Sequence, residues 1–263
     1  MPEIVECKIM SEFINHNCND RNFIDFSVIR DNNSIIESFN MNNFKIKSKA
    51  IGKQIIIELI FTDKIIPIYV FMGMSGNWKF VPKDKWDSIK FNRIKIDTED
   101  GYSLLLNGGY MGPKFSIGEN FKGVKRGPDP IDQFDDFKIN IINNIHKKEF
   151  EKTICEVLLN QKYFNGIGSY MTSEIVGRLD INPFRSLNSF SIDEINNLFD
   201  MIIKCCSESY KHGGGELMDW KNPFGYNSIK DWISFYGNNN ICYKQKFGTR
   251  NIWIKKKWIY GYN

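Results

Sequence analysis

The sequence predicts an α+β fold in which a β-rich first half precedes a helical second half. Short β-branched runs separated by turn residues fill most of roughly the first 120 residues. Beyond the rigid run Gly127-Pro128-Asp129-Pro130, apolar residues recur at helical spacing instead. This run is therefore the best boundary between two domains. A chain of 263 residues with 42% hydrophobic content can supply a core to each.

The first half is expected to open with a helix and to continue in strands. Val5, Ile9 and Phe13 share one face of a helix predicted around residues 3–15. Strands are then predicted at residues 44–49, 54–61, 65–72 and 90–96.

The second half is expected to hold three helices. The first is indicated by apolar residues at helical spacing, namely Phe150, Ile154, Val157 and Leu158. The turn Asn165-Gly166-Ile167-Gly168 ends it, and Ser169 stands where the N-cap of a second helix over residues 170–180 belongs. A third helix is predicted over residues 192–210.

The end of the chain is basic and aromatic, although the net charge of the whole is only +4. Residues 236–263 contain no Asp or Glu, and tyrosine, phenylalanine and tryptophan alternate there with six cations. Basic groups attract phosphate, and aromatic rings stack on bases and sugars. We interpret this segment as a folded basic element that binds nucleic acid, with a solvated basic tail as the alternative.

Several classes of protein are disfavoured by the sequence. No apolar run approaches the roughly 18 residues that a membrane helix needs. Glu3, Glu6 and Lys8 do not fit a signal peptide, so we expect a soluble intracellular protein. None of the six cysteines forms a Cys-x-x-Cys pair, so neither a zinc site nor a disulfide framework is indicated, and buried thiols are expected.

The run Pro2-Glu3-Ile4-Val5-Glu6 carries the clearest chemical signal. A small residue in second place normally allows removal of Met1, which would leave Pro2 as a free secondary amine flanked by two carboxylates. Such an amine can attack a sugar aldehyde carbon and form an iminium intermediate. An ordinary surface terminus is the alternative that this run alone leaves open.

The turn at residues 165–168 carries a second signal. Its two glycines allow a ligand to come close to the backbone, and the following helix presents N–H groups and the positive end of its dipole. This arrangement suits a phosphate group. A plain corner between two helices is the alternative.

The run Asn165-Gly166-Ile167-Gly168-Ser169-Tyr170 resembles the helix–two-turn–helix of the Fpg/Nei DNA glycosylases, most closely that of the vertebrate Nei-like branch. Other segments resemble the family in the same order over nearly the whole chain: Met1-Pro2-Glu3 with Glu6, Gly52-Lys53, the Gly-Met-Ser-Gly run ending at Gly76, Gly127-Pro128, the Gly-rich run starting at Gly213, Phe235-Tyr236-Gly237 and Arg250-Asn251.

The resemblance implies a domain organisation. It predicts an N-terminal β-sandwich catalytic domain over residues 1–126, a linker over 127–134, a helical domain with the helix–two-turn–helix over 135–235, and a β-hairpin finger over 236–263. Cys242 is the only cysteine of the finger, so a zincless finger without metal is implied. No cofactor is expected.

The resemblance also implies an activity, that of a bifunctional DNA glycosylase/AP lyase acting on oxidised bases, pyrimidines and hydantoins, in base excision repair. Pro2 would attack C1′ and form a Schiff base that proceeds through β,δ-elimination. Glu3 would shuttle protons, and Glu6 would orient the terminus. Lys53 would offer a cation to phosphate and sugar, and Arg250 would grip phosphates around the lesion.

The DNA contacts implied by the resemblance fall into three groups. Met74 would fill the hole that the flipped nucleotide leaves in the base stack. The turn would hold a phosphate, and a glycine-rich loop would lie over the everted base. The residues concerned are Asn165, Gly168 and Ser169 for the phosphate, and Gly214, Gly215 and Glu216 for the loop.

Three departures from the family pattern keep alternatives open. Ile4-Val5 stands in place of Gly-Pro, Ser169 in place of Asn, and two arginines are absent near Gly109, where Tyr110 and Met111 would substitute in part. A non-catalytic protein that binds damaged or single-stranded DNA is therefore a second hypothesis, and an unrelated α+β enzyme a third. We expect a monomer that binds damaged duplex DNA, with single-stranded DNA as a further substrate left open, and no membrane.

Overall fold

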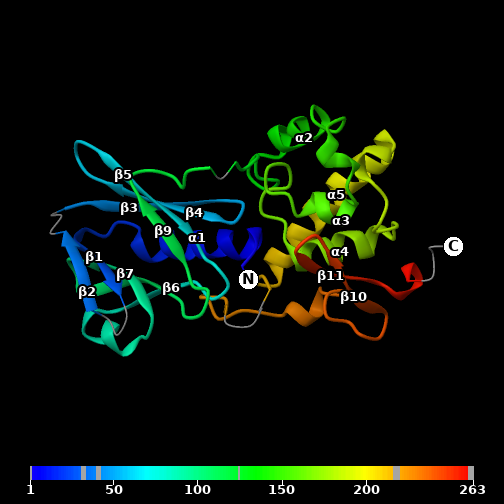
Figure 1. The fold of residues 1–263 in the computed structure, drawn as a ribbon. Coiled ribbons are helices and arrows are strands. Elements are labelled where there is room, and N and C mark those ends of the chain that lie inside the picture. The colour runs from blue at the N-terminus through cyan, green and yellow to red at the C-terminus, as the bar shows by residue number, and fades with distance from the viewer. Residues whose placement is uncertain (1, 31–33, 40–42, 124, 216–219, 260–263) are drawn as a thin grey trace. The chain divides into compact units, whose positions relative to one another are not determined.

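The chain folds into two compact units in a computed structural model that describes residues 2–30, 34–39, 43–123, 125–215 and 220–259 (Figure 1). The N-terminal unit combines Met1–Val124 with Gly213–Asn227, and the C-terminal unit combines Lys125–His212 with Ser228–Asn263. A segment from the second half of the chain therefore belongs to the first unit. The predicted domain boundaries stay a prediction.

The N-terminal unit opens with helix α1 (Ile4–Cys18) and continues in antiparallel strands. In the described part of the chain, one sheet has five strands in the order β2-β1-β7-β8-β6, and another has four in the order β3-β4-β5-β9. The strands are β1 (Phe23–Arg30), β2 (Ser34–Phe39), β3 (Lys45–Ile51), β4 (Gln54–Ile60), β5 (Ile65–Phe71), β6 (Asn77–Pro82), β7 (Asn92–Thr98), β8 (Tyr102–Asn107) and β9 (Lys114–Ile117), with a 3-10 turn at Lys83–Ser88.

Helix α1 packs on the four-stranded sheet through strand β3. Burial alternates along most of β3, with Ile46 and Ser48 buried between exposed lysines, as a strand with one covered face requires. Ser48 is buried against α1, where its hydroxyl lies 3.0 Å from that of Ser11. Strand β4 lies between β3 and β5 and is buried along nearly its whole length.

The C-terminal unit is helical and ends in a β-hairpin. Its helices are α2 (Phe134–Ile142), α3 (Ile154–Leu158), α4 (Ser169–Leu179) and α5 (Ile192–Lys211), and its strands are β10 (Cys242–Phe247) and β11 (Arg250–Lys255). Single 3-10 turns lie at Lys148–Glu151, Leu187–Ser189, Ile229–Asp231 and Lys256–Trp258. A capping box of Ser191 and Glu194 starts α5.

The predicted α+β class is confirmed, and so are the long periodic elements. Helices α1 and α5 and strands β3, β4, β5 and β7 begin and end within about three residues of their predicted bounds. The sequence prediction missed α2 and the strands β1, β2, β6, β8 and β9. The prediction that Ser169 is an N-cap is wrong: Gly168 holds that position in extended backbone, and Ser169 is the first residue of α4.

The predicted buried thiols are confirmed, since all six cysteines are buried and none is in a disulfide. Burial raises the pKa of Cys18 and of Cys205 to about 12. Among the residues that the structure describes, no helix is both long and apolar enough to cross a bilayer.

Candidate active site

The first turn of α1 holds the acidic residues predicted at the chain start. Pro2, Glu3 and Glu6 are all buried, and Glu3 is the N-cap of the helix. The Glu3 N–H donates to Oε2 of Glu6 at 2.6 Å, and the two residues form a capping box. The capping box fixes the backbone immediately after Pro2, because its two hydrogen bonds set the direction in which the chain enters the helix. Met1 lies outside the described residues.

The second oxygen of Glu6 is also engaged, by a residue far along the chain. Its Oε1 accepts the N–H of Gly215 at 2.5 Å. Gly214 has a φ of +82°, and a Cβ at this position would stand 2.9 Å from the same oxygen. Only glycine adopts this conformation readily and leaves room for the carboxylate. Glu6 therefore joins the chain start to the predicted lesion loop, of which Glu216 lies outside the described residues.

Described residues of the segment Gly213–Asn227 also contact the second half of α1. The ring of Phe224 makes edge contacts with Phe13 and His16, at centroid distances of 5.7 Å and 5.9 Å. The start of this segment is fixed by the side-chain amide of Asn222, which donates to the Gly213 carbonyl at 3.0 Å. Helix α1 is thus contacted by this segment near its start, at Glu6, and near its end, at Phe13 and His16.

Lys53 lies in the turn between β3 and β4, and strand β3 packs on α1. At the other end of β3, Lys45 Nζ donates to the Asp20 carbonyl just beyond α1, and midway Ser48 N–H donates to Asn15 Oδ1 at 2.7 Å. Strand and helix therefore run antiparallel. From Ser48 the strand continues for three more residues, about 10 Å, toward the N-terminal half of α1 and ends at Ile51. Lys53 lies in the two-residue turn that follows, at the end of β3 nearer the start of α1, and its role at the site stays a prediction.

The predicted base-stack residues meet at one loop junction. The Met74 N–H donates to the Met111 carbonyl at 2.8 Å, and the Ser75 hydroxyl donates to the Tyr110 carbonyl at 3.1 Å. A Cβ on Gly73 would stand 2.3 Å from the Met111 carbonyl oxygen, so the two loops touch through their backbones. Tyr110 and Met111 are 86% and 59% exposed.

Phe91 is a further exposed residue at this junction that the sequence prediction missed. Its side chain is 59% exposed, and its carbonyl accepts the Gly108 N–H at 3.0 Å. The sequence carries no clear signal that Phe91 is exposed, because Phe91 falls inside the β-branched run that predicted a strand over residues 90–96. The structure starts that strand at Asn92 and leaves Phe91 in the loop.

In the C-terminal unit, the turn before α4 is held by side-chain hydrogen bonds. Gln161 Oε1 accepts the Gly166 N–H at 3.0 Å, and its Nε2 donates to the Ile167 carbonyl at 2.8 Å. Gln161 was not predicted as a site residue, although it organises the turn. Gly166 has a φ of +94°, which favours glycine.

Asn165 and Ser169 occupy different environments in this turn. Asn165 is fully buried, its Nδ2 donates to the Gly127 carbonyl at 2.8 Å, and its Oδ1 accepts from Arg126 at 3.3 Å. Its amide therefore holds the chain that enters the unit. Ser169 is half-buried in the first turn of α4. That both residues bind DNA stays a prediction.

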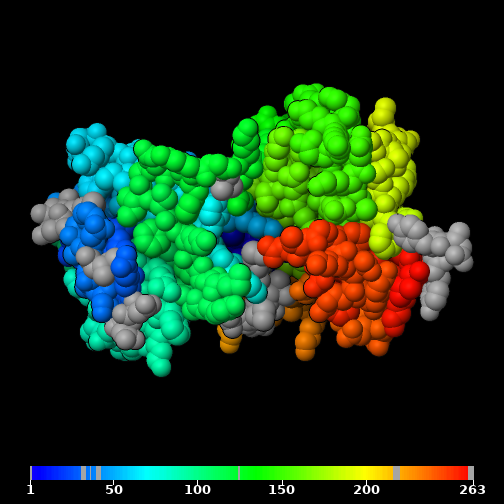
Figure 2. All heavy atoms as spheres, viewed as in Figure 1, coloured from blue at the N-terminus to red at the C-terminus, as the bar shows by residue number. Residues whose placement is uncertain are grey.

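The basic end of the chain is a folded hairpin. Strands β10 and β11 form one exposed block on the face of the C-terminal unit seen in Figure 2, orange to red. Its aromatic rings pack within the unit: Phe247 lies 5.3 Å from Phe184, and Trp253 lies 6.4 Å from Tyr236, between ring centroids. The interpretation as a folded element is confirmed, and these rings serve packing in the hairpin.

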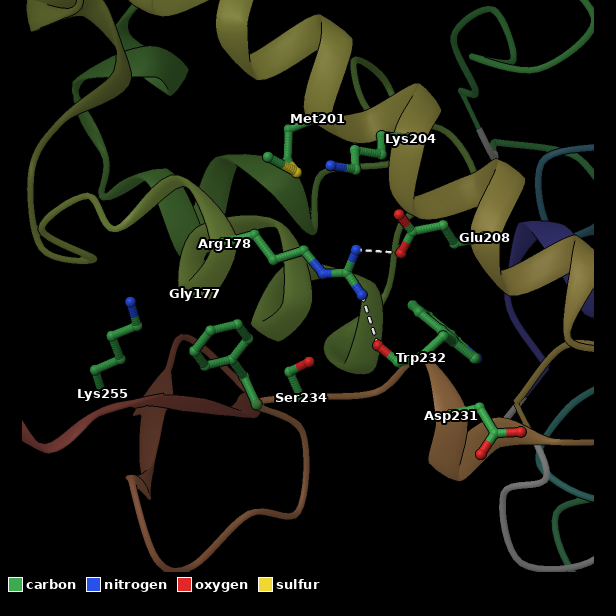
Figure 3. Close-up of a pocket in the computed structure, with 10 residues that line it drawn as sticks. Gly177, Arg178, Met201, Lys204, Glu208, Asp231, Trp232, Ser234 and Lys255 are labelled. Atoms are coloured by element: carbon green, nitrogen blue, oxygen red, sulfur yellow. Dashed lines mark hydrogen bonds and ion pairs between the residues drawn. The ribbon is translucent and has the colours of Figure 1, made fainter.

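Arg250 stands at the start of β11 with its side chain exposed. Its guanidinium has no ion pair or hydrogen bond with the described part of the chain. Arg178 differs: it bonds Glu208 and donates to the Trp232 carbonyl at 2.6 Å, beside a cavity of about 460 Å³ (Figure 3). The Arg178 cation is thus engaged within the fold, and the predicted phosphate contact of Arg250 stays a prediction.

Two buried side chains of α4 hold the hairpin and the loop before it. Glu174 is fully buried and accepts the backbone N–H groups of Ser234, Phe235 and Tyr236 at 2.8 to 3.0 Å. The Ser173 hydroxyl accepts the Trp253 N–H at 3.0 Å. Helix α4 therefore sets the position of the strand that carries Arg250.

No cluster of three or more His, Cys, Asp or Glu side chains within the described ranges could hold a metal ion. The hairpin holds Cys242, which is buried, and burial raises its pKa.

The chain was compared with family models and with known proteins. No protein-family model matches the chain. Human endonuclease 8-like 1 is 30% identical over 208 residues, which are 72% of this chain and 50% of that protein. The chain thus spans about half the length of that relative. Formamidopyrimidine-DNA glycosylase of Prochlorococcus marinus is 26% identical over 204 residues, 74% of this chain and 69% of that enzyme.

The chain belongs to the Fpg/Nei family.

The family assignment agrees with the fold. Fpg of Lactococcus lactis, solved as a variant in complex with DNA that contains Fapy-dG, has a TM-score of 0.79 to this chain. The likeness covers 97% of this chain and 98% of that one, at 17% sequence identity. The order of this Fpg/Nei chain, from strands with an opening helix to helices and a final hairpin, is therefore that of an Fpg structure.

Proposed function

We propose that this protein is a bifunctional DNA glycosylase/AP lyase that removes oxidised bases, with pyrimidines and hydantoins as the substrate class. The observation that carries the proposal is the buried helix start, where Glu6 bonds both Glu3 and Gly215 directly behind Pro2. A nucleophile at the chain terminus needs a rigid support, because a frayed terminus would lose the orientation on which its reactivity depends.

The chemistry follows from the residue types at this position. Once Met1 is removed, the Pro2 nitrogen attacks C1′ of the damaged nucleotide, and the base leaves with a proton from Glu3. The ring-opened sugar is then an iminium ion on Pro2, which acidifies the C2′ proton. Loss of that proton expels the 3′ phosphate, and a second elimination expels the 5′ phosphate. Water releases the sugar remnant and restores the amine.

Cations and helix termini supply the phosphate contacts in this proposal. Lys53, in the turn between β3 and β4, would offer its cation to the sugar and its phosphate, and Arg250 would supply planar paired donors from the hairpin. The segment from α3 through the turn to α4 acts as a helix–two-turn–helix, in which the first N–H groups of α4 receive a phosphate. The hairpin β10–β11 acts as a zincless finger, and the two sheets with α1 act as the β-sandwich of the catalytic domain.

Damaged duplex DNA is the partner that the relatives support. The Lactococcus lactis structures are complexes with DNA containing Fapy-dG or an abasic site. For this chain, Met74 would enter the base stack from a loop pinned to Met111. Filling the space of a flipped nucleotide offsets the cost of unstacking, which is a few kcal/mol.

A release assay tests the activity. The protein, expressed so that its first residue is Pro2, is mixed with duplex and single-stranded DNA carrying thymine glycol, a hydantoin or 8-oxoguanine. We expect strand cleavage at thymine glycol and hydantoin sites. Pro2→Thr should lower the cleavage rate at least about a hundredfold, because the nucleophilic amine is lost. Its affinity for DNA should stay unchanged, because the residues proposed to contact phosphates remain.

A non-catalytic DNA-binding protein on the same scaffold is the competing function. Ile4 and Val5, which replace the family's Gly-Pro, are buried in the core at 1% and 0% exposure. Binding of damaged DNA without cleavage, and indifferent to Pro2→Thr, would establish this alternative. Its affinity should fall steeply with salt, as phosphate contacts require.

A further inference from the structure

The segment Gly213–Asn227 is closed at its two ends. The Ser228 N–H, just beyond the segment, donates to the His212 carbonyl at 3.0 Å, and His212 Nδ1 lies 2.8 Å from the Ser228 hydroxyl. Next to this pair, a Cβ on Gly213 would stand 2.2 Å from the Tyr226 carbonyl oxygen, so the backbones touch there. The first and last residues of the segment are therefore held side by side.

Asn227, the last residue of the segment, bonds its start. The Asn227 side-chain Nδ2 donates to the Gly214 carbonyl at 3.3 Å and to the Gly213 carbonyl at 3.5 Å. The peptide group that carries the Gly214 carbonyl also carries the Gly215 N–H, which donates to Glu6 Oε1. A planar trans peptide points its carbonyl and its N–H in opposite directions. The peptide between Gly214 and Gly215 is therefore held on one side by Asn227 and on the other by Glu6.

We propose that Asn227 is a positioning residue for the Pro2 nucleophile and acts through this peptide and Glu6. The inference rests on the proposed function. Donation by the Asn227 amide polarises the peptide and strengthens the bond from its N–H to Glu6. The other carboxylate oxygen of Glu6 accepts the Glu3 N–H, directly after Pro2. Without the amide the carboxylate is held less firmly, and the nucleophile loses part of the orientation that attack on C1′ requires.

Asn222 supplies a matched comparison within the same segment. Its amide also donates to a carbonyl at the start of the segment, that of Gly213 at 3.0 Å, and both asparagines are half-buried. The Gly213 carbonyl belongs to the preceding peptide, which is not the one that donates to Glu6. Asn222 and Asn227 thus share residue type and kind of bond, and of the two only Asn227 bonds the Gly214 carbonyl.

The first test measures borohydride trapping under single-turnover conditions on DNA with an abasic site, together with the Kd for that DNA. The chain is expressed with Pro2 as its first residue. Asn227→Ala should lower the trapping rate at saturating DNA about five- to tenfold, the effect of one lost hydrogen bond. Its Kd should stay at the wild-type value, because no phosphate contact is removed. Asn222→Ala should trap at the wild-type rate.

A double-mutant cycle tests the route through Glu6. In Glu6→Gln the side chain keeps one acceptor oxygen, so its bond to either Glu3 or Gly215 is broken. The connection from Asn227 to Glu3 is interrupted in both cases. Adding Asn227→Ala to Glu6→Gln should therefore lower the trapping rate further by less than about twofold, because two residues that act in one network are not additive.

Hydrogen exchange of the free protein gives a readout that does not depend on activity. The Gly215 amide should exchange about tenfold faster in Asn227→Ala than in wild type, because its bond to Glu6 opens more often. In Asn222→Ala the same amide should exchange at the wild-type rate. Asn227→Asp presents an oxygen in place of the N–H at nearly the same volume, and it should speed the exchange of Gly215 as well.

The outcomes separate this inference from the proposed function. Absence of trapping by the wild-type protein rejects the proposed function. Trapping by wild type that Asn227→Ala leaves unchanged rejects only the role of Asn227. An equal fall in Asn222→Ala would show a general loosening of the segment, and a raised Kd with an unchanged rate would make Asn227 a DNA-binding residue. Either result would overturn the inference, as would an undiminished effect of Asn227→Ala beside Glu6→Gln.

Discussion

Gly214 determines how closely the segment Gly213–Asn227 can approach α1. Its positive φ and the 2.9 Å between a Cβ and Glu6 Oε1 are two separate demands on the same residue. Gly225, in the same segment, has a φ of +80° and no atom within 4 Å of a Cβ. Substitutions at Gly214 and Gly225 would therefore share the backbone strain, and only the one at Gly214 would add a contact with the Glu6 carboxylate.

Gly214→Ala should destabilise the protein more than Gly225→Ala. Both variants force a Cβ into the left-handed region, at a cost of about 1 kcal/mol. Gly214→Ala adds a clash with Glu6, worth about 1 to 3 kcal/mol more by analogy with overpacked cores. Urea unfolding measures both free energies. Equal losses in the two variants would show that Glu6 does not fill the space behind Gly214.

Some of the candidate site follows from adjacency in sequence, and some does not. Pro2, Glu3 and Glu6 meet because a helix start brings its N-cap and third residue together. The bond from Gly215 to Glu6 joins positions 209 residues apart, which no local pattern predicts. Phe91 escaped prediction because exposure of an aromatic ring depends on where a strand begins, and strand boundaries are weakly encoded.

The secondary structure was predictable where burial follows a simple period. Helix α5 shows a clean apolar face, whereas β1 buries Ser27 and half-buries Asp25, which hides its strand pattern. Ser27 can be buried because its hydroxyl donates to Asp25 at 3.0 Å. The hairpin position was not predictable either, because the backbone N–H groups of Ser234, Phe235 and Trp253 donate to side chains of α4 some 60 to 80 positions earlier in the chain.

Glu174→Gln should release the loop that precedes the hairpin. The Glu174 carboxylate accepts three backbone N–H groups and pairs with Arg178, and an amide would turn an NH₂ group toward one of these donors. We expect a loss of about 2 to 4 kcal/mol in unfolding free energy. Hydrogen exchange should show faster exchange of the amides of residues 234–236.

Glu208→Gln is the matched control for this change. Glu208 also pairs with Arg178, but its side chain is 32% exposed and accepts no bond from the loop backbone among the described residues. Glu208→Gln should lower the free energy of unfolding by about 1 kcal/mol or less and leave the amides of residues 234–236 protected from exchange. Unchanged protection in Glu174→Gln would mean that Glu174 does not anchor the loop.

Taken together, the two units carry many carboxylates held in the ionised form, so acid should weaken the fold. Burial acts to raise the pKa of Asp97, but hydrogen bonds from Lys95, Ser103 and Lys83 outweigh it and lower the pKa. Bonds to Arg185 lower the pKa of Glu194 to about 2. The pKa values of Asp100, Glu149 and Asp180 are lowered as well. A lowered folded pKa contributes stability above the unfolded pKa near 4, and this is lost as pH falls.

Asp97→Asn should reduce this acid sensitivity and weaken the protein at neutral pH. The substitution removes the carboxylate 2.6 Å from Lys95, whose side chain is 6% exposed, and leaves that cation with Asp25 at 3.9 Å. We expect a loss of about 3 kcal/mol at pH 7, as for other broken buried pairs. The gap to wild type should begin to narrow below about pH 4, where Asp97 of the unfolded chain becomes protonated, and should close as the pH falls through the lowered pKa of Asp97 in the folded protein. Unfolding free energies from pH 2.5 to 7 measure this, with the exposed Asp63→Asn as control, and a gap that stays constant would contradict the account.

The most direct test of the whole account is the site at which borohydride fixes DNA to the protein. The chain with Pro2 as its first residue is reduced with borohydride on DNA that carries an abasic site, digested, and mapped by mass spectrometry. The account predicts the deoxyribose adduct on the nitrogen of Pro2, next to the buried pair of Glu3 and Glu6. An adduct on Lys53 or another lysine, or strand cleavage without any adduct on Pro2, would contradict it.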